Sequence, residues 1–291
     1  MIKNKRIVLS LDVKLHHLYL TMINYKSTIK TSDLRIGISS YSQAIKLLFT
    51  PKFAIYLIFP LILNIIIFYL GNNLISNIID PLNNYILDLL SLKGDQTGFL
   101  FYLRKFLSGL VWILIKVSFF VAYIFIGGYL IITLMSPVYA FLSEKTERHI
   151  SGHTYKTTIT EFLYDIYRGL LIALRNVLLE LGWAILMFLA SFIPLIGFIT
   201  PIIMFFITAY FYGFSFIDYS LERRRYNINE SIRFCRRNRW TLIGNGTVFT
   251  LLLTIPIIGP TLAGFASLVA VMAATISTEK IFQNQQYTTN D

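Results

Sequence analysis

The sequence predicts an all-α integral membrane protein with two long transmembrane helices and two helical hairpins interrupted by proline and glycine. Three observations lead to this fold class. The chain is 55% hydrophobic with a mean hydropathy of +0.63, and only 14% of its residues are charged, against about 25% in an ordinary soluble domain. Four long apolar segments follow one another along the chain. The last two are each broken by the same Pro-x-x-Gly pattern.

The two ends of the chain are expected to lie outside the membrane domain. Residues 1–36 are basic and aperiodic, which predicts a loosely ordered cytoplasmic extension. Residues 37–50 mix apolar and polar positions at helical spacing, which is typical of an amphipathic helix at the membrane interface. We expect the membrane domain to cover 37–280 and a polar C-terminal tail to cover 281–291.

The first two apolar segments, about 53–79 and 106–135, are each long enough to cross a bilayer core, which needs about 20 residues. Ser136-Pro137 then reads as an N-cap followed by proline at the first helical position, so it predicts a helix that leaves the membrane. The stretch TITE, residues 158–161, is a capping-box pattern and predicts the amphipathic helix that leads into the third segment.

The third and fourth segments, about 177–218 and 241–277, do not have the length of simple spans. The third is too long for one straight helix, and the part of the fourth before Pro256 offers only about 15 residues, below the spanning threshold. Proline removes a helix hydrogen bond, and glycine accepts backbone angles that other residues avoid. We therefore predict hairpin tips at Pro194 and Gly197, and at Pro256 and Gly259.

Both predicted tips are wholly apolar, so we expect them to stop inside the bilayer, where protein or a watery cavity must cover their free backbone groups. Two ordinary spanning hairpins with short apolar loops are the alternative. The similarity of the two segments also suggests an internal repeat, a common feature of transporters.

The distribution of Lys and Arg predicts the orientation. Residues 1–52 carry nine Lys or Arg and two acids, and residues 218–240 carry seven Arg and three acids, whereas 72–105 is balanced at three against three. The positive-inside rule then places both termini and the arginine-rich loop in the cytoplasm and the 80–105 loop outside.

The sequence contains no pattern that predicts catalysis. It has neither a Walker-type glycine-rich loop nor a G-x-S-x-G nucleophile elbow, so we expect no enzyme activity and no cofactor, and the hydropathy argues against nucleic-acid binding. His149 and His153 are four residues apart, but Gly152 lies between them, so we expect a solvated turn and no metal site.

Two stretches offer anion chemistry. The seven arginines of residues 217–240 could hold an anion by paired hydrogen bonds, or they could anchor lipid headgroups. At TPKFA, residues 50–54, Pro51 leaves free N–H groups on Phe53 and Ala54 beside the cation Lys52, which is a generic anion site. Glu180, in the third apolar segment, is either a functional acid or a headgroup-depth partner of Arg175 or Lys116.

Five stretches, taken in their order and spacing, resemble one known family. They are IKLLFTPKFAIYLIFPLILN (45–64), SPVYAFLSEKTE (136–147), FIPLIGFITPI (192–202), FIDYSLERRRYNINESIRFCRRNRW (216–240) and IPIIGP (255–260). Together they resemble the CysZ sulfate permeases, whose superfamily includes the eukaryotic etoposide-induced membrane proteins, over about 37–280. The resemblance implies a homo-oligomer in the bacterial inner membrane that takes up sulfate toward cysteine synthesis without hydrolysing ATP.

The chain departs from this family at one place. The family has a sulfate-binding Gly-x-Arg-Arg motif where this chain has Lys52, Phe53, Ala54 and Ile55, so only Lys52 brings charge. Arg236 and Arg239 fall where family members place cations. The function expected is movement of a small inorganic anion, sulfate or a related oxyanion. The alternative is a non-transporting membrane scaffold of the same fold that has lost the sulfate site.

Overall fold

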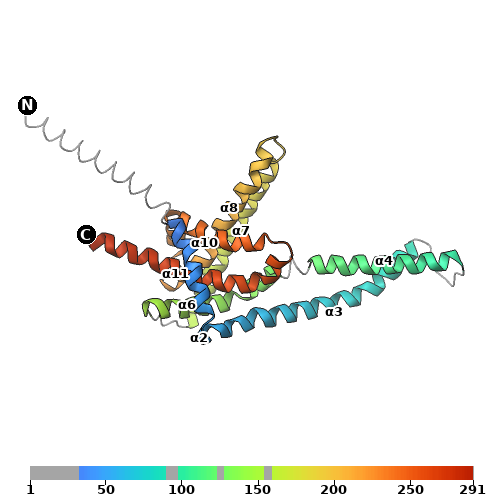
Figure 1. The fold of residues 1–291 in the computed structure, drawn as a ribbon, viewed down its shortest axis with the longest axis horizontal. Helices are drawn as coiled ribbons and strands as arrows, with labels where there is room; N and C mark the ends of the chain where they lie inside the picture. The colour runs from blue at the N-terminus through green and yellow to red at the C-terminus, as the bar shows by residue number, and fades with distance from the viewer. Residues whose placement is uncertain (1–32, 90–97, 123–127, 154–158, 291) are drawn as a thin grey trace, which may run out of the picture. The chain divides into compact units, whose positions relative to one another are not determined.

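A computed structural model of the chain describes residues 33–89, 98–122, 128–153 and 159–290, and every regular element in these ranges is helical, which confirms the all-α prediction (Figure 1). Residues 33–48 form the first helix. The following elements are α2 (Pro51–Ala54), η1 (Ile55–Leu57), α3 (Ile58–Leu89), α4 (Phe99–Ala122), α5 (Gly128–Leu134), α6 (Ser136–Ser151), α7 (Ile159–Ala190), α8 (Ile196–Arg223), α9 (Ile228–Arg237), α10 (Arg239–Leu253) and α11 (Ile258–Asn290).

The chain divides into two compact units. The first comprises Met1–Leu47, Ser143–Thr250 and Val269–Asp291, and the second comprises Leu48–Leu142 and Leu251–Leu268. In the first unit α7 and α8 run side by side as a hairpin, and in the second α3 and α4 do the same.

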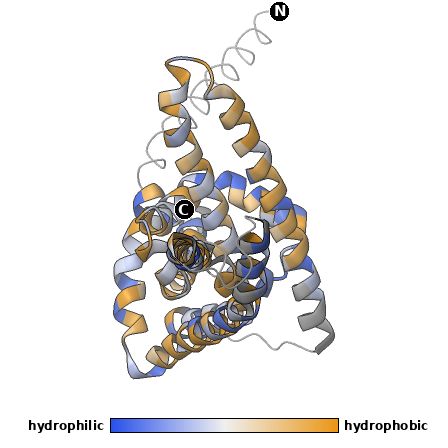
Figure 2. Ribbon diagram, turned by 90° about the vertical axis from the view of Figure 1, so that its right-hand side faces the viewer, coloured by the Kyte–Doolittle hydropathy of each residue, from blue (hydrophilic) through white to orange (hydrophobic). Residues whose placement is uncertain are grey.

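Four helices among the described residues are long and apolar enough to cross a membrane: Pro51–Ile78, Tyr167–Ala190, Ile196–Arg223 and Ile258–Gln285. The predicted second segment, 106–135, appears as α4 and α5 and is not one of these four. In the most apolar 18-residue stretch of α7 only 11% of the residues are buried, and in that of α8 only 22%. Apolar residues dominate this hairpin (Figure 2). In the corresponding stretch of α11, 72% of the residues are buried, so α11 packs against protein, whereas the side chains of α7 and α8 are free to contact lipid.

Both predicted hairpin tips are turns with the same backbone path. The turn between α7 and α8 has Leu195 at a φ of 72°, and the turn between α10 and α11 has Ile257 at a φ of 67°. The amide of Gly197 donates to the carbonyl oxygen of Ile193 at 3.0 Å, and Gly259 makes the equivalent bond at 2.9 Å. In each tip the residue with positive φ is therefore the one directly after the proline, and the glycine two positions later does not have a positive φ.

The glycines of the tips are required by close approach. A Cβ atom on Gly197 would lie 2.6 Å from the carbonyl oxygen of Ser191, and one on Gly259 would overlap the carbonyl oxygen of Leu252. Because each glycine stands in the first turn of the following helix, its missing side chain lets the end of the preceding helix come back against it.

Several boundaries differ from the sequence prediction. The first helix begins at Asp33, so the last residues of the predicted extension are helical, and residues 1–32 lie outside the described ranges. The predicted tail at 281–291 continues α11 to Asn290. α6 begins at Ser136, one residue before the predicted first helical position, Pro137. α7 begins at Ile159 next to the predicted capping box, whose Thr158 is not among the described residues.

Candidate functional site

The predicted anion contacts at the start of the first span form a short helix. Pro51 is the first residue of α2, and the amides of Phe53 and Ala54 donate to the carbonyl oxygen of Thr50 at 3.0 and 2.9 Å. The Phe53 ring is buried, and Lys52 is exposed. The two amides predicted to bind an anion are thus hydrogen-bonded within the turn. Lys52 is the residue of this segment whose charged side chain is exposed.

Arg236 and Arg239 lie in the other compact unit, at the end of α9 and the start of α10. Both side chains are exposed, and the Arg239 guanidinium carbon lies 5.6 Å from the centre of the Trp240 ring. The predicted anion contacts are therefore two separate groups, one in each unit.

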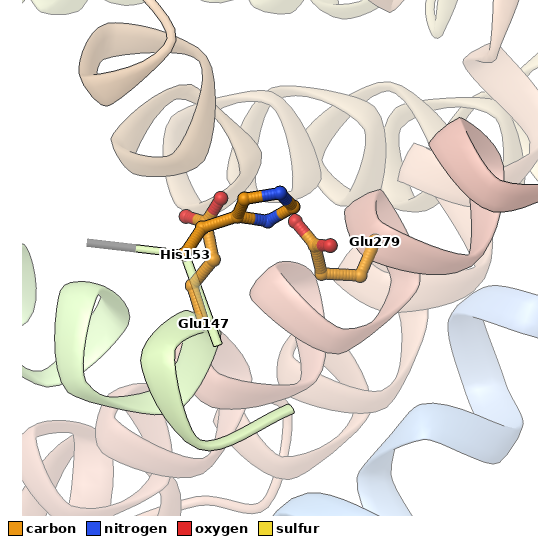
Figure 3. A group of neighbouring side chains, drawn as sticks. All are labelled: Glu147, His153 and Glu279. Atoms are coloured by element: carbon orange, nitrogen blue, oxygen red, sulfur yellow. The ribbon is translucent and has the colours of Figure 1, made fainter. Parts of the chain in front are cut away.

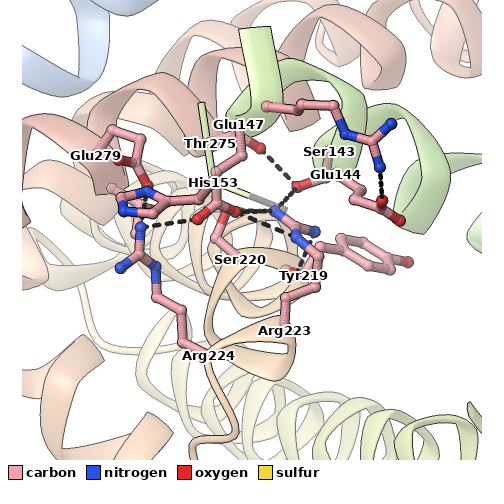
Figure 4. A network of polar contacts seen from close by, with 12 residues as sticks. Ser143, Glu144, Glu147, His153, Tyr219, Ser220, Arg223, Arg224, Thr275 and Glu279 are labelled. Atoms are coloured by element: carbon pink, nitrogen blue, oxygen red, sulfur yellow. Dashed lines mark hydrogen bonds and ion pairs between the residues drawn. The ribbon is translucent and has the colours of Figure 1, made fainter. Parts of the chain in front are cut away.

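The first unit contains a buried charge network that the sequence did not reveal (Figure 4). Glu147 of α6 is fully buried, and its Oε2 atom accepts from Nη2 and Nε of Arg223 at 2.7 and 3.1 Å. Arg223 also donates to the carbonyl oxygen of Tyr219 at 2.7 Å and to the hydroxyl of Ser143 at 2.9 Å. A full set of charge-assisted bonds thus ties α6 to the end of α8.

Arg224 extends the network to α11. Its Nη2 atom donates to Oε1 of Glu147 at 2.8 Å and to Oε1 of Glu279. Its guanidinium carbon lies 4.1 Å from the centre of the Phe282 ring, within cation–π range. The network thus holds two carboxylates against two guanidinium groups, so its charges balance.

A second buried arginine joins α7 to α8. Arg168 donates to both carboxylate oxygens of Asp218, at 2.9 and 3.1 Å, and to the hydroxyl of Ser231. Its Nε atom donates to the carbonyl oxygen of Tyr226 at 2.8 Å, which fixes the turn between α8 and α9. The pair is almost completely buried, with side-chain exposures of 2% and 7%.

His153 points toward the two acids of the network, so one nitrogen and two carboxylate oxygens lie within 4.8 Å of one another (Figure 3). α6 ends at Ser151, and His149 and His153 are both exposed, as expected for the solvated turn predicted there. These three side chains are metal-ligand types, but Arg224 already stands between the carboxylates. A metal ion would have to displace that guanidinium, so the arginine serves here as the compensating cation.

Water can reach the edge of the network through a pocket of about 370 Å³ in the first unit. Its walls come from the first helix, α6 and α11, and they include His149, Glu279 and Lys280. Glu279 therefore lies between the Arg224 guanidinium and a pocket lined by both apolar and polar side chains.

The sequence carried only a weak signal for this network. Glu147 ends the stretch SEKTE and Glu279 lies in STEK, each at the edge of an apolar helix where an ionisable residue calls for a partner. Glu180, the acid that the sequence singled out, bonds to the side chain of Thr208. Of the two partners considered for it, Arg175 donates to Oδ1 of Asn176 at 2.9 Å and Lys116 donates to Oδ1 of Asn72 at 3.4 Å.

Comparison with known proteins gives one family for most of this chain. A family model described as "Sulfate transporter CysZ/Etoposide-induced protein 2.4" matches residues 40–262. A Vibrio cholerae protein named Sulfate transporter CysZ is 26% identical over 253 residues, which cover 86% of this chain and 96% of that protein. A protein of the same name from Pseudomonas fluorescens is 25% identical over 222 residues, 74% of this chain and 83% of that protein.

The helical structure, the four candidate spans and these matches agree with one another. They identify a multi-pass membrane protein and confirm the resemblance read from the sequence motifs. The chain belongs to the CysZ/etoposide-induced protein 2.4 family.

Proposed function

We propose that this protein moves a small inorganic anion, sulfate or a related oxyanion, across the bacterial inner membrane, with both termini in the cytoplasm and as a homo-oligomer. The observation that carries the proposal is a set of ionisable residues near the ends of candidate spans that turn away from solvent: Arg168, Asp218 and Glu279 are buried, and the Arg223 side chain is 11% exposed. Charges inside spans are costly and commonly mark ion pathways. The relatives are named as sulfate transporters, and these names support the transport proposal. They give no support to a non-transporting scaffold.

The chemistry of the network suits an oxyanion. Guanidinium groups match the geometry of sulfate oxygens and remain charged at any physiological pH. In the resting structure Arg223 and Arg224 are held by Glu147 and Glu279, so an incoming anion must compete with a carboxylate for the same donors. That competition would make the site weak, as a permeation site must be if the ion is to leave again.

Outside the buried network, our predicted contacts for the anion remain Lys52 at the start of α2 and Arg236 and Arg239 on the surface of the first unit. The amides of Phe53 and Ala54, also predicted as contacts, would have to give up their bonds to Thr50 in order to bind it. Because the Gly-x-Arg-Arg motif is absent, we expect the Lys52 contact to be weak and easily screened by salt.

Flux into proteoliposomes tests the proposal. Purified full-length protein is reconstituted, and uptake of labelled sulfate, thiosulfate, molybdate and phosphate is compared with that of protein-free vesicles. We expect at least one oxyanion to enter faster through the protein. If folded protein gives no flux above the empty vesicles for any of them, the transport proposal is wrong.

A matched pair of variants tests the role of the network. Glu147→Gln with Arg223→Gln removes one buried ion pair without changing the net charge, and we expect it to lower the flux at least tenfold. Glu144→Gln with Arg148→Gln removes a 2.6 Å pair on the same helix whose side chains are 28% and 53% exposed, and we expect unchanged flux. Equal flux in both variants would show that the network only holds helices together.

A further inference from the structure

We propose that the exposed arginine face of α9, defined here as Arg233, Arg236 and Arg237 together with Arg239 at the start of α10, binds the headgroup phosphates of anionic phospholipids. Six of the seven arginines of residues 218–240 fall into two groups. Arg223 and Arg224 point into the buried network, whereas the four members of the arginine face are exposed.

The face is set by the way α9 packs. Ser231, Phe234 and Cys235 are buried, and the 100° step of a helix places Arg233, Arg236 and Arg237 on the opposite side. The Phe234 ring stacks on that of Phe282, with centres 5.3 Å apart. A capping box between Asn227 and Glu230 closes the first turn, with bonds of 2.9 and 2.8 Å. These contacts fix the orientation of α9 about its own axis, so its arginines stay on the exposed side.

The charge of this face is uncompensated within the described part of the chain. None of the ion pairs found there involves Arg233, Arg236, Arg237 or Arg239. Residues 225–240 contain five Arg and one acid, a net charge of +4. That acid, Glu230, accepts a hydrogen bond from the amide of Asn227 in the capping box. A cluster of basic residues fixed beside a membrane is a standard way to attract anionic lipids.

The turn before α9 places the face at the membrane surface. The candidate span Ile196–Arg223 ends at the turn, and the amide of Tyr226 bonds back to the carbonyl oxygen of Leu221 at 3.2 Å. α9 therefore starts at the level of the last turn of an apolar span. Trp240, next to Arg239, is the residue type that sits at headgroup depth.

A lipid phosphate and a free oxyanion offer guanidinium groups the same chemistry, and we commit to the lipid. An exposed, shallow set of arginines binds a small mobile anion only weakly and briefly because salt screens each contact. Arg236 and Arg239 therefore remain available to lipid even if the transported anion contacts them in passing. An anionic leaflet presents many phosphates at once at a fixed depth, so the contacts add. The inference does not depend on which anion is transported, because its test does not measure flux.

Lipid binding can be counted by native mass spectrometry of the detergent-purified full chain, titrated with phosphatidylglycerol or phosphatidylcholine. We expect a preference for phosphatidylglycerol that falls as NaCl is raised. The variant Arg236→Gln/Arg237→Gln should bind phosphatidylglycerol on the order of tenfold more weakly. Arg236→Lys/Arg237→Lys keeps the charge and should retain most of the preference, so it separates lost charge from lost folding.

The control Arg35→Gln/Lys46→Gln removes the same number of charges from exposed positions of the first helix in the same unit. These two cations are eleven positions apart and do not form a cluster, so the lipid preference should fall clearly less than in the α9 variant. An equal loss in the control and the α9 variant would overturn the proposal, because bulk charge would then explain both. No loss in the α9 variant would overturn it as well. Displacement of the lipid by millimolar sulfate, beyond the effect of NaCl at equal ionic strength, would assign the site to a free anion instead.

Discussion

At the residue scale, the buried charges are balanced pair by pair, and this gives a sharp prediction for Arg224. Its removal as Arg224→Gln leaves Glu279, whose side chain is 4% exposed, without its ion-pair partner, and leaves Glu147 with only Arg223. An uncompensated buried carboxylate costs about 3 kcal/mol. We therefore expect a loss of that order in the free energy of unfolding, measured by denaturant titration of the solubilised protein.

The double variant Arg224→Gln/Glu279→Gln supplies the control for this prediction. It removes one acid together with one arginine, so Glu147 and Arg223 remain as a one-to-one pair. We expect the double variant to be more stable than the single Arg224→Gln variant, because no buried charge is left alone. If both variants lose the same stability, packing of Arg224 on Phe282 is the main contribution of this side chain and charge balance is not.

At the scale of the element, replacing a glycine by alanine should have opposite effects at the two hairpin tips and in the middle of a helix. Gly197→Ala and Gly259→Ala each place a Cβ atom against the backbone of the preceding helix end, so we expect each to destabilise the protein by about 1–3 kcal/mol. Gly182, inside α7, has nothing within 4 Å of its would-be Cβ, so Gly182→Ala should raise stability by about 0.5–1 kcal/mol. Thermal unfolding of the three variants checks the signs, and a neutral Gly259→Ala would contradict the packed tip.

These tips also show how far the sequence could predict this structure. Pro-x-x-Gly marked the position of both turns, because proline and glycine act locally on the helix that contains them. It did not show that Leu195 and Ile257 take the left-handed angle, since that follows from how the helix ends meet. Nor could the charge network be predicted, because Glu147 and Arg224 are 77 positions apart and their pairing depends on the packing of whole helices.

At the scale of the whole molecule, the membrane topology follows from the charge distribution and can be tested with single cysteines. The natural Cys235 should not react with the label in such a test. It is completely buried, and burial, reinforced by the Asp218 carboxylate, raises the pKa of its thiol well above the usual range, so little reactive thiolate exists at neutral pH. Replacing it as Cys235→Ser still gives the cleanest background.

On that background we predict that Asn229→Cys, at an exposed position of α9, reacts with a membrane-impermeant maleimide only after the cells are permeabilised. Phe99→Cys, 78% exposed and within the predicted outer loop at 80–105, should react in intact cells. Leu195→Cys, also 78% exposed but at an apolar tip, should react from neither side if the hairpin stops within hydrocarbon, and from outside if it spans.

Labelling of Asn229→Cys in intact cells would show that the orientation is the reverse of the predicted one. Partial labelling of both Asn229→Cys and Phe99→Cys would indicate that the protein inserts both ways, because three basic against three acidic residues in 72–105 bias that loop only weakly.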